Sequence, residues 1–102
     1  MMMAYDSSQT PPSRLDDGTV EAVRSALRIF TESGVPTDEL RASLVHMAAE
    51  AREKAMLPEH LLVVLKGIWS SLSEVRAMAD TARQIHLQQR VVTMCIKEYY
   101  SS

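Results

Sequence analysis

Four residues in the middle of the chain have the types and spacing that phosphoryl transfer or close docking would use: His60, Lys66, Gly67 and Ser71. An imidazole can act as a nucleophile that carries a group covalently, and a nearby lysine can neutralise an added phosphoryl charge. On a helix, however, a separation of six residues turns Lys66 about 120° away from His60. These two side chains therefore do not share one site on the helix.

The Lys66-Gly67 pair resembles the second half of the His-x-x-Lys-Gly pattern of histidine phosphotransfer domains, which are helical bundles. In that pattern the lysine lies one turn from the imidazole, and the small residue leaves room for a partner. The spacing in this chain is longer and breaks the pattern. A phosphorelay carrier, with His60 or His46 as phosphoacceptor, is an alternative function that an acid-labile phosphoryl adduct would reveal.

His60, Gly67 and Ser71 lie along one edge of the same predicted helix. A glycine inside a helix costs up to about 1 kcal/mol relative to alanine, so Gly67 requires a compensating contact. A close helix crossing at Gly67 and Ser71 would supply one. A docking surface for a partner beside His60 would supply another.

Further candidates for chemistry are weaker. His46, Glu50 and Glu53 are predicted to share the solvated side of a helix, an arrangement that could bind a divalent metal but is more typical of an exposed polar face. Cys95 is the only cysteine, and its place between apolar rows predicts a buried, inert thiol. We therefore expect no metal site and no disulfide.

Two common kinds of enzyme site are missing from the sequence. No serine lies in a Gly-x-Ser-x-Gly elbow, and the three glycines do not form a phosphate-binding loop. We therefore predict that the protein is not an enzyme and needs no cofactor.

Composition limits the classes of partner and the compartment. Hydrophobic residues make up 46% of the 102-residue chain and charged residues 24%, which is typical of one globular domain. A net charge of -2 disfavours binding to nucleic acid or anionic membrane, although a helical nucleic-acid-binding regulator remains a third alternative. The lone cysteine and the lack of an export signal or a spanning apolar run predict a cytoplasmic protein.

Helical periodicity dominates the chain. Residues 1–15 have no apolar period and are predicted to form a flexible tail, and residues 16–102 to form a single domain. Capping and breaking residues predict helices starting at Thr19, Thr37, Pro58 and Asp80 or Thr81, with Ser33-Gly34 ending the first. An irregular break is expected within 70–80. The predicted fold class is an all-α bundle of about four helices.

The last predicted helix carries apolar residues around about 200° of its circumference, more than one neighbouring helix would cover. Either a homodimer contact through this helix or a shorter helix folded over it would bury the excess. We predict a non-enzymatic protein–protein interaction module, a small regulatory or adaptor protein that self-associates and binds a further, unidentified protein. The residues predicted to bind are His60, Gly67, Ser71, Val91, Met94 and Tyr100.

Overall fold

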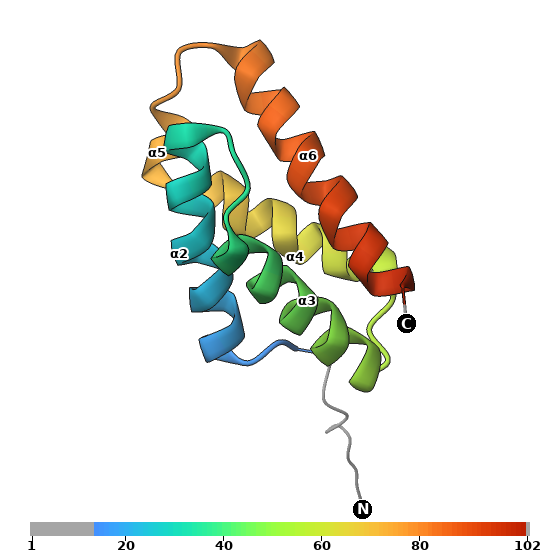
Figure 1. The fold of residues 1–102 in the computed structure, drawn as a ribbon. Coiled ribbons are helices and arrows are strands. Elements are labelled where there is room, and N and C mark those ends of the chain that lie inside the picture. The colour runs from blue at the N-terminus through green and yellow to red at the C-terminus, as the bar shows by residue number, and fades with distance from the viewer. Residues whose placement is uncertain (1–13, 102) are drawn as a thin grey trace, which may run out of the picture.

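In a computed structural model, which describes residues 14–101, five α-helices follow one another and no strand occurs in that range (Figure 1). One of them is a single turn, so the architecture is the predicted all-α bundle built on four longer helices. The helices are α2 (Asp17–Ser33), α3 (Asp38–Glu53), α4 (Pro58–Ser71), α5 (Ser73–Arg76) and α6 (Thr81–Tyr100).

Most helix ends lie where local signals predicted them. The Thr37 hydroxyl accepts a hydrogen bond from the Leu40 N–H at 3.0 Å, and the Asp80 carboxylate accepts one from the Arg83 N–H at 3.1 Å. Both bonds satisfy an amide that would otherwise lack a partner at the start of a helix. Gly34 ends α2 with φ +71°, a left-handed conformation that favours glycine. The expected break within 70–80 is also present, because α4 ends at Ser71 and α5 at Arg76.

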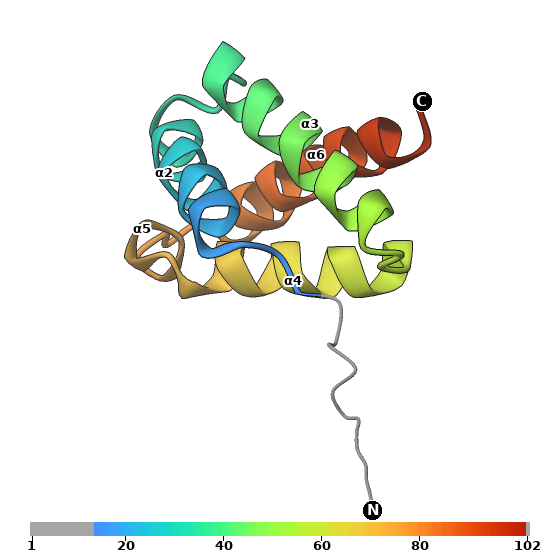
Figure 2. The same ribbon diagram turned by 90° about the horizontal axis from the view of Figure 1, so that it is seen from below.

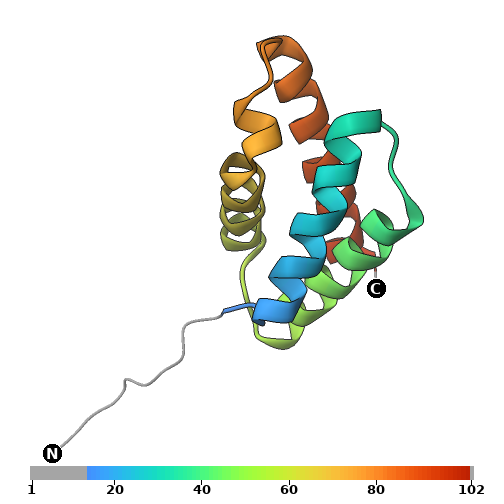
Figure 3. The same ribbon diagram turned by 90° about the vertical axis from the view of Figure 1, so that its left-hand side faces the viewer.

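Helices α2 and α6 each pack against both α3 and α4. Helix α3 contacts both α2 and α6, whereas α4 contacts α6, α5 and α2. Seen from below, α4 runs along one side of the molecule with α2, α3 and α6 on the other (Figure 2). The side view shows α2 between α4 and α3 (Figure 3). One long face of α4 is therefore left without another described helix against it.

The core lies where these helices cross. Trp69 is buried, and its ring centroid is 6.5 Å from that of Phe30. Because α3 and α4 both contact α6, the bundle itself covers much of the wide apolar arc of α6. Side chains that are at most 1% exposed include Val23, Leu27, Phe30, Leu40, Leu44, Met47, Leu61, Leu65, Leu87, Val91 and Cys95.

Two predictions at the N-terminal side need correction. Leu15 was assigned to the tail, but it is 5% exposed and belongs to the hydrophobic core, so packing begins before the predicted boundary. Thr19 was expected to cap the first helix, yet α2 starts two residues earlier and Thr19 is buried inside it. Of the predicted tail, residues 1–13 lie outside the described residues.

Among the described helices, none combines the length and the apolar character that crossing a bilayer requires.

Candidate functional site

The residues weighed as metal ligands on α3, His46, Glu50 and Glu53, do not gather on a solvated face. Glu50 was expected on the solvated side with His46 and Glu53, but its side chain is only 7% exposed and reaches α2. It accepts hydrogen bonds from the Asp16 N–H at 2.6 Å, from the Thr19 hydroxyl and from the Lys54 ammonium at 2.8 Å. Within residues 14–101, no group of three His, Cys, Asp or Glu side chains could hold a metal ion.

The charge of Glu50 is set by these donors. Burial by itself raises the pKa of a carboxyl group, but the hydrogen bonds from Lys54, Thr19 and the Asp16 backbone outweigh burial and lower the pKa of Glu50 to about 2. The bond to Glu50 likewise raises the pKa of Lys54. Glu50 therefore stays negatively charged and connects α3 to α2 through these hydrogen bonds, so its role is structural.

Cys95 is buried, as the sequence predicted. Burial, followed by the nearby charge of Glu98, raises the pKa of its thiol to about 11. A thiol that stays protonated at neutral pH is a poor nucleophile, so this residue offers no catalytic chemistry.

The six predicted binding residues do not form one site. His60, Gly67 and Ser71 are exposed on α4. Tyr100 is 66% exposed at the end of α6. This end meets the start of α4, where the Tyr99 hydroxyl donates to the Met56 carbonyl at 2.7 Å.

The two remaining predicted residues lie inside the bundle or at its edge. Val91 is 1% exposed, so a dimer contact through this residue is wrong: its side chain already packs in the core of one chain. Met94 is half-buried and packs against the core from the space between α3 and α6.

The structure excludes one of the two explanations for Gly67, a close helix crossing within this chain. A Cβ built at Gly67 would meet nothing within 4 Å, so the expected close crossing with another helix of this chain is absent. Ser71 is occupied locally, because its hydroxyl donates to the Ile68 carbonyl at 2.7 Å. The glycine thus stays unexplained within the described fold, and the docking explanation remains.

Gly67 belongs to an outward surface that we name the α4 face. Val63, one turn before the glycine, lies at its centre and is 67% exposed, and Leu57 just before the helix is 64% exposed. Its two charges, Glu59 and Lys66, follow one edge. Helical periodicity indicates this surface, because Val63 lies on the opposite side of α4 from the buried residues Leu61, Leu65, Ile68 and Trp69. The members of the α4 face are Glu59, His60, Val63, Lys66, Gly67 and Ser70.

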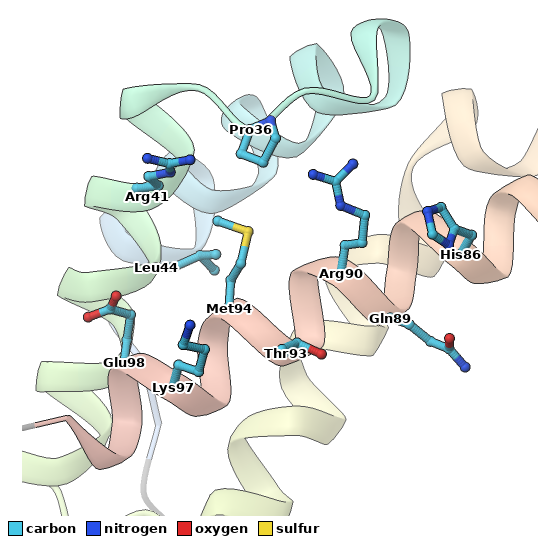
Figure 4. Close-up of a pocket in the computed structure, with 10 residues that line it drawn as sticks. All are labelled: Pro36, Arg41, Leu44, His86, Gln89, Arg90, Thr93, Met94, Lys97 and Glu98. Atoms are coloured by element: carbon cyan, nitrogen blue, oxygen red, sulfur yellow. The ribbon is translucent and has the colours of Figure 1, made fainter.

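A second surface, the α3–α6 groove, was not predicted. It is an open depression of about 660 Å³ between the start of α3 and the part of α6 from His86 to Glu98. Figure 4 shows Arg41 on α3 and Arg90, Met94 and Lys97 on α6 around the same space, with Pro36 at one end. The apolar lining of the groove includes the partly exposed Met94 and Pro36 and the fully buried Leu44, and Glu98 adds one carboxylate.

The cations of the groove differ in how firmly they are held. The Arg90 guanidinium donates to the Gly34 carbonyl at 2.7 Å and lies 5.7 Å from the centroid of the Phe30 ring. Neither Arg41, Arg90 nor Lys97 forms an ion pair with any described acidic residue. The groove therefore presents positive charge that the bundle does not neutralise by direct contact.

Sequence reasoning missed this groove because Arg41 and Lys97 are far apart in the chain. The eleven Lys and Arg residues are scattered along the sequence, so no single segment indicates a positive cluster. One signal was present: His86, Arg90 and Lys97 are four and seven residues apart and therefore share one face of α6. Only the packing of α3 against α6 adds Arg41 to them.

With the geometry established, comparison with known proteins adds nothing to it: no protein-family model, curated protein or solved structure matches this chain. What the fold and the surfaces define is a small helical bundle with a largely polar helix face, at whose centre Val63 is exposed, and a separate cationic groove.

Proposed function

We propose that this protein is a non-enzymatic protein–protein interaction module, a small regulatory or adaptor protein that self-associates through the α4 face. The observation that carries the proposal is the pairing of a largely exposed Val63 with a helical Gly67 that no side chain of the bundle covers. A second helix laid against this face would bury the valine. It would also supply the close approach that a helical glycine permits.

The charges of the α4 face favour a second copy as the occupant. Glu59 and Lys66 have opposite signs, lie two helical turns apart and stand about 20° apart around the helix axis. In an antiparallel pair with two-fold symmetry, Glu59 of each protomer would face Lys66 of its partner. The two-fold axis would then pass close to Val63, so the two valines would pack at the centre of the contact.

The expected association is modest in strength. A contact confined largely to one helix of 14 residues falls at the small end of specific interfaces, so we expect a Kd of about micromolar. Leu57 and Tyr100, both exposed where α6 meets the start of α4, would extend the contact at its ends.

Charge exchange tests this arrangement. Sedimentation equilibrium is expected to show a dimer for the wild type, and weaker association for Glu59→Lys and for Lys66→Glu, because each single change places like charges opposite one another. The double variant carrying both changes restores the opposite pairing and is expected to regain the dimer. Glu53→Lys and Arg76→Glu, at exposed positions outside the α4 face, serve as charge-matched controls.

Two outcomes would refute the proposal. One is a wild type that stays monomeric at about ten times the expected Kd. The other is a double variant no better associated than the single ones, since self-association would then use another surface.

We further propose that the protein acts in the cytoplasm. The support is Cys95, a lone buried thiol of high pKa that suits a reducing compartment. Secretion of the endogenous protein into the medium would contradict this assignment.

A further inference from the structure

We propose that the α3–α6 groove binds an acidic amphipathic helix of a partner protein. The inference rests on the protein-binding function proposed above but uses a different surface. It names the chemistry of the second partner that an adaptor requires.

Charge is the first argument. Arg41, Arg90 and Lys97 face the groove with Glu98 as the one carboxylate among its lining residues, so with His86 neutral the groove carries a net charge of +2. The whole chain carries -2, so everything outside the groove carries -4. A positive region on an otherwise acidic protein selects an anionic ligand and orients it as it approaches.

The apolar lining of the groove argues for a polypeptide rather than a nucleic acid. Met94 and Pro36, both partly exposed, offer a hydrocarbon surface that a leucine side chain would cover, whereas a phosphate backbone would gain nothing from it. Glu98 lies beside Lys97 and would repel a continuous row of phosphates. A helix with carboxylates on its edges and leucines along one face can avoid that repulsion, because its charges are spaced.

The length of the groove fits a short helix. From His86 to Glu98, α6 rises about 18 Å, which corresponds to a ligand helix of about twelve residues. Arg90 is already oriented by the Gly34 carbonyl and the Phe30 ring, so it loses less freedom on binding than a free arginine would. Its other N–H groups stay free to donate to a carboxylate.

A direct binding measurement tests the proposal. The probe is a fluorescent helical peptide of about twelve residues with leucines on one face and glutamates at the edges, titrated with the full chain at low ionic strength. Its matched control is the same peptide with lysine in place of glutamate. We expect saturable binding of the glutamate peptide only, weakened by added salt.

Variants locate the site. Arg41→Glu combined with Lys97→Glu is expected to weaken binding about tenfold or more, because each lost ion pair accounts for up to about fivefold and each new carboxylate adds repulsion. Arg52→Glu combined with Arg76→Glu changes the net charge equally at exposed positions outside the groove, and is expected to leave affinity within about twofold. Circular dichroism of both double variants verifies that the bundle folds.

The outcomes separate this inference from self-association. A wild type that dimerises but does not bind the glutamate peptide overturns the groove proposal alone. Equal loss of binding in the two double variants would also overturn it, because net charge and not the groove would then control affinity. A labelled single-stranded oligonucleotide that binds more tightly than the peptide, and loses affinity with Arg41→Glu and Lys97→Glu, would replace the peptide with nucleic acid.

Discussion

Glu50 makes the stability of the bundle sensitive to acid. Its pKa is about 2 in the folded chain against an ordinary value of 4.5, so the folded state holds its negative charge more strongly than the unfolded state does. The contribution of Glu50 is therefore complete above about pH 4.5. It is lost as the pH falls toward 2 and the folded carboxylate takes up a proton.

We predict that Glu50→Gln lowers the free energy of unfolding at neutral pH by about 1 to 3 kcal/mol, because Lys54 and Thr19 lose a charged acceptor. The gap between the variant and the wild type should narrow as the pH falls from 4.5 to 2. Urea titrations followed by circular dichroism across that range measure it. Glu53→Gln, at an exposed position on the same helix, should change stability little at any pH, and an undiminished Glu50→Gln effect near pH 2 would contradict the assignment.

The misassignment of Glu50 has a simple physical origin. The apolar stripe of α3 consists of Leu40, Leu44, Met47, Ala48 and Ala51. Glu50 lies about 100° from the centre of that stripe, at its border rather than opposite it. A helix with one neighbour would expose such a residue. Because α3 packs between α2 and α6, its buried arc is wider than the apolar pattern indicates, and the border residues Ser43 and Glu50 are enclosed by α2.

At the scale of elements, the helix boundaries were the most predictable feature. Thr37, Pro58 and Asp80 act locally, since a cap or a first-turn proline stabilises its own helix start whatever packs nearby. The neighbours of each helix were not predictable in the same way. The wide apolar arc of α6 indicated an extra partner, and contacts with both α3 and α4 supply much of that cover within one chain.

Gly34 and Gly67 differ in backbone conformation and in the space around them. We predict that Gly67→Ala raises the free energy of unfolding by up to about 1 kcal/mol, because Gly67 is helical and the added methyl meets nothing. Gly34→Ala should lower it by about 1 to 2 kcal/mol, since φ +71° disfavours any residue with a Cβ, and the Arg83 guanidinium would lie 3.2 Å from the new atom. Thermal unfolding at dilutions where the chain is monomeric measures both, and a destabilised Gly67→Ala monomer would show that Gly67 has an intramolecular role.

At the scale of the whole molecule, the candidate site was the least predictable part. The α4 face lies on one helix, so Gly67 and His60 were identified from spacing alone. The groove combines Arg41 from α3 with Lys97 from α6, and no local pattern relates residues that only tertiary packing brings together. The same limit explains Val91, which is apolar in the sequence whether it faces a partner or the core.

The separation of the two surfaces leads to a final prediction about stoichiometry. No residue of α4 lines the α3–α6 groove, and α4 runs along one side of the bundle with α3 and α6 together on the other (Figure 2). A dimer formed through α4 should therefore leave both grooves open. Isothermal titration calorimetry is expected to give one acidic peptide per chain in the dimer as in the monomer. A saturating concentration of the peptide should leave the dimerisation constant unchanged, because peptide bound in the groove does not alter the affinity of the α4 face for a second chain. One peptide per dimer, or a dimer that dissociates as peptide binds, would place the two contacts on a shared surface.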